Sequence, residues 1–146
     1  MVGRDLSGGR FVTMFLAMLD DRTGAFEYVS AGQGPLYLVR SGGSIEELVV
    51  ARPPLGIPST GDPRAEIASD RLLPGDCLVV VSDGVLDRVD PSGESYGEAR
   101  LTALLKSAAG LTAPDMVEAI RDSNDAFACG EAATDVASIL VVSHSS

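Results

Sequence analysis

The chain has 146 residues, which is the size of one ordinary domain. Apolar residues make up 45% of the chain and charged residues 22%, so we expect a buried core and exclude an intrinsically disordered protein. The formal net charge of −10 argues against a surface that binds nucleic acid or anionic lipid. The sequence contains neither a long apolar run nor a signal-peptide pattern, so the expected location is the cytoplasm, with no membrane contact.

The first half of the chain has the pattern of antiparallel strands separated by turns. Apolar or alternating segments predict strands over residues 11–19, 25–31, 36–40, 45–50 and 66–73. Residues that favour turns fill the short gaps at Asp20–Gly24 and Ser41–Ser44. The segment Arg52–Pro58 is too rich in proline for regular structure and predicts a loop.

The second half contains one more buried strand, two helices and a last strand. The segment Cys77–Ser82 is apolar on both alternating faces, which predicts a central strand covered on both sides. Helical spacing predicts helices over residues 98–109 and 112–130, the first capped by Gly110 and the second by Thr112. The apolar stripe of the second helix is expected to be Met116, Val117, Ile120 and Phe127. A final strand over 136–142 completes an α+β chain with helices on mainly antiparallel sheet.

The cysteines and the single histidine do not indicate catalysis. Cys77 and Cys129 are far apart and are expected to be small core residues rather than a disulfide framework. His144 lies in a polar terminal segment, so a Ser-His-Asp or Cys-His site would have no credible base.

Two acidic residues stand at predicted strand ends, where a carboxylate can be held rigidly beside a turn. Asp83 follows the central strand and is followed by Gly84, and Asp135 precedes the last strand. Such a pair suits a hard divalent cation such as Mg²⁺ or Mn²⁺, which prefers oxygen ligands. On spacing alone the alternative stays open, because Asp-Gly is a common turn pair and Asp is common before strands.

Seven short motifs occur in order along nearly the whole chain and together carry a resemblance to a known family. They are Arg10–Phe15, Ala31–Pro35, Pro54–Gly56, Leu73–Asp76, Ser82–Val85, Tyr96–Leu101 and Thr134–Ser138. In this order they resemble the metal-dependent serine/threonine protein phosphatases, known as the PPM or protein phosphatase 2C (PP2C)-like family. More narrowly, they are similar to its bacterial branch, named for the stage II sporulation phosphatase, which includes regulators of sigma-factor partner switching.

The resemblance implies a fold, a chemistry and a set of site residues. The fold would be an α-β-β-α sandwich, with two Mn²⁺ or Mg²⁺ ions between two antiparallel sheets. The metal pair would activate a water that attacks the phosphorus of phosphoserine or phosphothreonine in a regulatory protein. Asp83 and Asp135 match metal ligands of the family, and Gly84 matches a glycine that we expect to be structural.

The sequence also departs from the family pattern. The family's first metal motif, an Asp with a neighbouring glycine followed by Gly-His-Gly, has no match in residues 1–10, where Asp5 lacks the following glycine. Near the C-terminus a usual pair of acids is replaced by Asp135 and Val136. Residues 1–146 are therefore expected to form a single phosphatase-like domain that lacks the family's N-terminal strands and helices.

These departures leave more than one function open. The chain is either part of a phosphoprotein phosphatase, as a fragment or by borrowing ligands from another chain, or a shortened, inactive module that acts by protein binding. Two carboxylates without the other ligands should bind metal weakly, so we expect little Mn²⁺-dependent hydrolysis of p-nitrophenyl phosphate by this chain alone. We also expect an uncovered apolar sheet face to drive homodimerisation, which sedimentation at high dilution would test.

Overall fold

The computed structural model describes residues 12–48 and 67–145. The chain divides into two compact units, one made of residues 1–34 and 49–71 and the other of residues 35–48 and 72–146. Each unit is described by itself. Within the described residues, no helix is long and apolar enough to cross a membrane.

The first unit contains a three-stranded antiparallel sheet in the order β1-β2-β5. Its strands are β1 (Met14–Leu19), β2 (Ala25–Ala31) and β5 (Ala68–Arg71). The predicted turn joins β1 to β2: the Asp20 amide donates to the Ala25 carbonyl, and Gly24 adopts a φ of 72°. That left-handed conformation favours glycine, so the turn follows from local sequence.

Strand β1 is an apolar edge strand that is exposed along most of its length. Leu16 is 55% exposed and Met18 is 74% exposed. An exposed apolar edge strand is a common pairing surface. Homodimerisation through an uncovered apolar sheet face stays a prediction.

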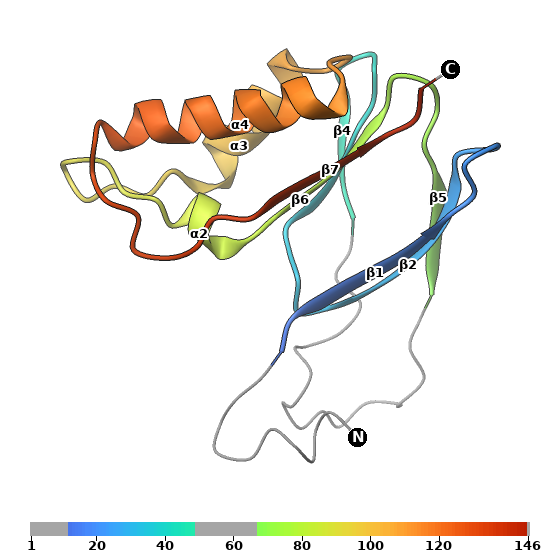
Figure 1. The fold of residues 1–146 in the computed structure, drawn as a ribbon, viewed down its shortest axis with the longest axis horizontal. Helices are drawn as coiled ribbons and strands as arrows, with labels where there is room; N and C mark the ends of the chain where they lie inside the picture. The colour runs from blue at the N-terminus through green and yellow to red at the C-terminus, as the bar shows by residue number, and fades with distance from the viewer. Residues whose placement is uncertain (1–11, 49–66, 146) are drawn as a thin grey trace. The chain divides into compact units, whose positions relative to one another are not determined.

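The second unit is built on a four-stranded antiparallel sheet in the order β4-β3-β6-β7 (Figure 1). Its strands are β3 (Leu36–Val39), β4 (Ile45–Glu47), β6 (Cys77–Val81) and β7 (Ile139–Ser143). Strand β6 lies between β3 and β7, and each of its residues is buried. The prediction of a central strand with both faces covered is confirmed.

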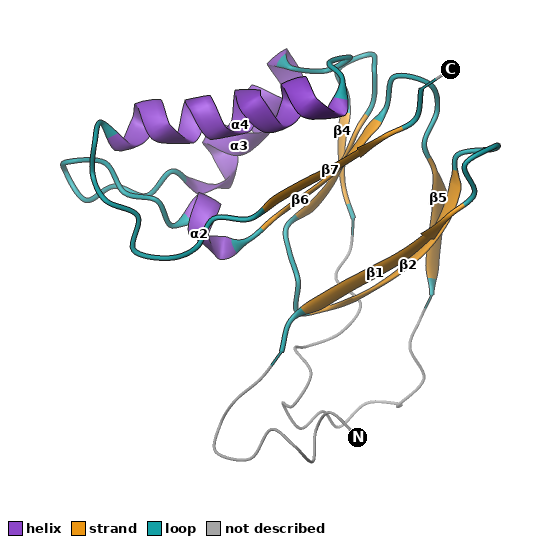
Figure 2. Ribbon diagram, in the orientation of Figure 1, coloured by secondary structure: helices purple, strands orange, loops and turns teal. Residues whose placement is uncertain are grey.

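Helices α2 (Asp83–Leu86), α3 (Gly97–Ser107) and α4 (Ala113–Ala128) belong to the same unit (Figure 2). Thr112 caps α4 as predicted, because its Oγ1 accepts a hydrogen bond from the Asp115 amide. The odd-numbered residues of β3 and β6 pack against α3 and α4 in one core, which includes Tyr37, Val79, Leu101, Leu105, Met116 and Ile120. The α+β class with mainly antiparallel sheet is therefore confirmed.

The structure corrects two expectations about local structure. The last strand begins at Ile139 rather than Val136, because Val136 and Ser138 are bonded to Ser82, the residue after β6, instead of pairing as a strand. The single turn of α2 was not predicted, since four residues are too few to show helical periodicity.

One more correction concerns a single side chain. Cys129 is not a core residue: it is exposed and ends α4 in a left-handed conformation with a φ of 48°, whereas Cys77 is buried as expected. His144 is half-buried, and its carbonyl accepts a hydrogen bond from the Gly75 amide. Asp5, the proline-rich loop and the Pro54–Gly56 motif lie outside the described residues.

Candidate metal-binding site

The pairing of β6 with β7 brings the two predicted ligands to one edge of the sheet. The strands are antiparallel, and Val81 at the end of β6 lies opposite Ile139 at the start of β7. Asp83 follows β6 as the first residue of α2, and Asp135 lies in the loop before β7. The two loops that carry these carboxylates therefore start from neighbouring strand ends (Figure 1).

Ser82 joins the two loops by hydrogen bonds. Its hydroxyl donates to the Val136 carbonyl at 3.1 Å and accepts from the Ser138 amide at 2.8 Å. Its own amide donates to the Ser138 carbonyl at 3.0 Å. Ser82, the residue before Asp83, is therefore bonded to both Val136 and Ser138 in the segment that follows Asp135.

Gly84 allows the same two loops to touch. A Cβ atom built at Gly84 would lie 2.2 Å from the Val136 carbonyl oxygen and 2.6 Å from the carbon of that carbonyl. Both atoms belong to backbone that the Ser82 hydroxyl already holds, so they have little freedom to move. A residue other than glycine would push the Asp83 turn away from the Asp135 loop.

The described residues make few hydrogen bonds to the carboxylates of Asp83 and Asp135. Asp83 is exposed, and no described residue donates a hydrogen bond or forms an ion pair with its carboxylate. Asp135 is also exposed, and its Oδ1 accepts from the adjacent Val136 amide at 2.7 Å. Most of their oxygen lone pairs are therefore free to bind a cation.

The donor chemistry fits Mn²⁺ or Mg²⁺, but the number of donors falls short. Hard divalent cations prefer carboxylate oxygens, and Mg²⁺ requires near-octahedral coordination. Across residues 12–48 and 67–145, no group of three or more His, Cys, Asp or Glu side chains could hold a metal ion. Asp83 and Asp135 can supply only part of a ligand set, and their role as ligands stays a prediction.

The structure also reveals supporting residues that the sequence patterns did not indicate. Asn124 of α4 donates from its side-chain amide to the Val85 carbonyl of α2 at 2.8 Å. Arg88, just after α2, donates from Nη2 to the Glu131 carbonyl at 2.8 Å, in the loop that leads to Asp135. The available signal for Asn124 was its position four residues after Ile120, where a polar residue interrupts the apolar stripe.

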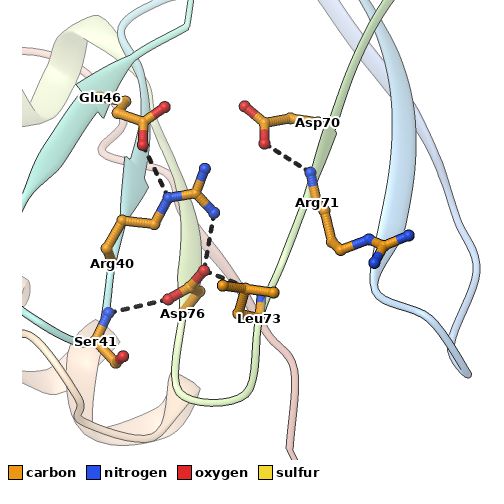
Figure 3. Close-up of polar contacts among 7 residues, drawn as sticks. All are labelled: Arg40, Ser41, Glu46, Asp70, Arg71, Leu73 and Asp76. Atoms are coloured by element: carbon orange, nitrogen blue, oxygen red, sulfur yellow. Dashed lines mark hydrogen bonds and ion pairs between the residues drawn. The ribbon is translucent and has the colours of Figure 1, made fainter.

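A third carboxylate, Asp76, lies at the other end of β6 and is fully engaged (Figure 3). It is 1% exposed and accepts hydrogen bonds from the Arg40 guanidinium at 2.9 Å and from the Ser41 and Leu73 amides at 3.0 Å each. Burial raises the pKa of the Asp76 carboxyl, but these hydrogen bonds and the Arg40 charge outweigh burial and hold it below its usual value. Asp76 therefore fastens two turns together, and both of its carboxylate oxygens accept hydrogen bonds from the protein.

Comparisons with known proteins agree with this fold. A family model described as stage II sporulation protein E (SpoIIE) matches residues 1–145. Protein IcfG of Synechocystis sp. is 31% identical over 95 residues, which are 65% of this chain and 15% of that protein. The SiaA-PP2C domain of Pseudomonas aeruginosa superposes with a TM-score of 0.74 at 25% identity, over 88% of this chain and 50% of that chain.

A more distant neighbour shares the same fold. The structure of RsbX in complex with magnesium has a TM-score of 0.63 at 14% identity and covers 95% of this chain and 59% of that chain. At this identity the likeness establishes the fold alone. The chain spans 50% of the SiaA-PP2C chain and 59% of the RsbX chain. Because the family model covers nearly the whole chain, the chain belongs to the SpoIIE family of PP2C-type phosphatase domains.

Proposed function

We propose that this chain is part of a protein serine/threonine phosphatase that hydrolyses phosphoserine or phosphothreonine in a bacterial regulatory protein. Asp83 and Asp135 are proposed to be ligands of the catalytic metal ions, Mn²⁺ or Mg²⁺. The observation that carries this proposal is the contact of Gly84 with the Val136 carbonyl, because it presses the two carboxylate loops together at one sheet edge. Family membership supports the reaction class.

In this proposal, each residue of the site has a separate task. Bound metal ions would lower the pKa of a coordinated water and neutralise charge on the phosphoryl group. Asp83 and Asp135 would hold the ions, and Ser82 and Gly84 would keep the two carboxylate loops together. The remaining side-chain ligands would come from outside the described residues, since those residues contain no group of three or more His, Cys, Asp or Glu side chains that could hold a metal ion.

Metal titration of the chain tests the ligand assignment. We expect Asp83→Asn and Asp135→Asn each to weaken Mn²⁺ binding at least about tenfold in calorimetry, because each removes an anionic oxygen ligand. Asp87→Asn is the matched control, since Asp87 is exposed at the end of the same α2 turn and should leave the affinity unchanged. Equal Mn²⁺ affinity in all four proteins would overturn the assignment.

Phosphate release tests the catalytic part of the proposal. The chain alone should hydrolyse p-nitrophenyl phosphate slowly with Mn²⁺, because its ligand set is incomplete. A gene product that also carries the missing ligands should release phosphate from a phosphoserine protein, and Asp83→Asn should abolish this. Turnover that survives Asp83→Asn would exclude this metal site as its source.

An inactive phosphatase-like binding module is the second candidate. It is favoured because the described parts of the chain contain no group of three or more His, Cys, Asp or Glu side chains that could hold a metal ion. A module of this kind would bind its protein partner equally well with Mn²⁺ or with a chelator, and equally well as Asp83→Asn. Pull-down of a phosphorylated partner under both conditions separates the two functions.

A further inference from the structure

The turn that carries Asp83 cannot hold its own position. Helix α2 has four residues, and its N-cap residue Ser82 makes no side-chain capping bond to it. Helices of this length are unstable by themselves, because one turn fixes many backbone angles for very few hydrogen bonds. The direction in which Asp83 points must therefore be set by contacts from other elements.

Asn124 makes such a contact from helix α4. It is 5% exposed and shares the buried face of α4 with Met116, Ile120 and Ala128. A buried amide is costly unless it is hydrogen-bonded, and the Asn124 side chain donates to the Val85 carbonyl within α2 at 2.8 Å. An apolar residue at this position would fill the core equally well but could not bind α2.

The loop that carries Asp135 is tied to the same elements. It begins where α4 ends, at Cys129, and the Arg88 guanidinium just after α2 donates to the Glu131 carbonyl at 2.8 Å. The amide of Tyr96, the residue before α3, donates to the Arg88 carbonyl at 2.7 Å. This bond holds the Arg88 backbone from which the guanidinium side chain extends. Helix α4 is thus bonded through Asn124 to α2, which carries Asp83, and its C-terminal end continues directly into the loop that carries Asp135.

We propose that Asn124 is a positioning residue that sets the place of Asp83 relative to Asp135 by holding α2 against α4. It does not touch the metal or the substrate and acts through the Val85 carbonyl. This inference deepens the proposed function and rests on it for the metal-binding role of Asp83. Outer residues that orient ligands of this kind commonly change metal affinity by 10-fold to 100-fold when they are replaced.

Two replacements of Asn124 and one matched control test this role. Asn124→Ala removes the side chain, and Asn124→Leu removes the donor while keeping an apolar side chain of similar size in the core. Ser123→Ala is the control, because the Ser123 hydroxyl lies 2.7 Å from the Tyr96 hydroxyl and links the adjacent position of α4 to a residue outside α2. Thermal unfolding is recorded for every variant so that affinity is compared at equal folded fractions.

The two readouts are amide hydrogen exchange of residues 83–87 without metal and Mn²⁺ affinity by calorimetry. We expect both Asn124 variants to exchange faster at these amides and to bind Mn²⁺ about tenfold more weakly. Ser123→Ala should change neither, even though it also loses a partly buried contact. Exchange at β6 should stay the same in all variants, which shows that the effect is local.

The outcomes that overturn this role differ from those that overturn the proposed function. Unchanged exchange at residues 83–87 in both Asn124 variants overturns the positioning role, whatever the Mn²⁺ result. The role also fails if Asp83→Asn weakens Mn²⁺ binding and Asn124→Leu does not. Faster exchange at α2 in Asn124→Leu, with Mn²⁺ affinity insensitive to Asp83→Asn, instead overturns the assignment of Asp83 as a ligand.

Discussion

The two ends of strand β6 use the same residue type for different purposes. At the first end, Asp76 is buried and accepts hydrogen bonds from Arg40, Ser41 and Leu73. At the other end, Asp83 is exposed, and no described residue binds its carboxylate. The Asp76 carboxylate stabilises the fold, whereas the Asp83 carboxylate is available to bind a ligand.

The difference shows how a functional carboxylate is distinguished from a structural one. A buried carboxylate is stable only when its lone pairs are satisfied, and Asp76 meets this condition with protein donors. At the Asp83 end, the hydrogen bonds are made by neighbours instead: Ser82 bonds the backbone after Asp135, and Asn124 bonds α2. The scaffold is rigid there while the carboxylate itself remains free.

The largest effect on stability is expected at Asp76. Asp76→Ala removes the buried acceptor that one Arg40 guanidinium nitrogen and two backbone amides share, so the free energy of unfolding should fall by about 3 kcal/mol. Urea denaturation measures this change, and Asp83→Ala is the control with the same chemical replacement. Equal losses in the two variants would contradict the contrast between the two ends.

Acid should reduce the contribution of the Asp76 carboxylate to stability. Its pKa is lower in the folded chain than in the unfolded chain, so its contribution to stability is complete above the ordinary Asp value of about 3.9. That contribution is lost as the pH falls through the folded pKa. Asp76→Asn should flatten the decline in unfolding free energy below about pH 4, and an equally steep decline in this variant and in the wild type would contradict the role of Asp76.

Gly84→Ala should have the next largest effect. The added Cβ would overlap the Val136 carbonyl, so the backbone must move, at a cost of about 2 kcal/mol. Mn²⁺ affinity should fall with it, because the Asp83 and Asp135 loops separate. Gly42→Ala is the control, since nothing lies within 4 Å of a Cβ there, and a wild-type Mn²⁺ affinity in Gly84→Ala would contradict the role of this contact.

Ser82→Ala should cost about 1 kcal/mol, because the loop before β7 loses a hydroxyl that both donates and accepts. Faster amide exchange at Ser138 would show that the loss is local to this loop. Ser107→Ala is the control, since its hydroxyl only donates to the Leu104 carbonyl of its own helix. Unchanged exchange at Ser138 would mean that strand pairing alone joins the loops.

The smallest change in stability is expected for Asp83→Asn, within about 0.5 kcal/mol, because an exposed carboxylate without partners contributes little to folding. Its Mn²⁺ affinity should nevertheless fall the most of all these variants. A destabilisation comparable to that of Asp76→Ala would show that Asp83 is structural as well.

Much of the fold could be predicted from local sequence patterns. The central strand, the turn at Asp20–Gly24 and the cap of α4 at Thr112 appear where the patterns placed them, because each depends on residues that are close in sequence. The expectations that failed concern Cys129 and the start of β7, whose environments depend on distant segments. Local patterns carry no information about such contacts.

By itself, the sequence determined the elements of this protein, its family motifs and the positions of Asp83 and Asp135 at strand ends. Only the tertiary structure decided that the two loops touch, through a Ser82 hydroxyl bonded 54 residues away and a glycine pressed against the Val136 carbonyl. The tertiary structure also decided that Asn124, a polar residue within the apolar stripe of α4, binds α2. Its side-chain amide donates to a carbonyl 39 residues away. The physical reason is that propensity and periodicity are local properties, whereas a binding site is formed by segments that meet only after the chain has folded.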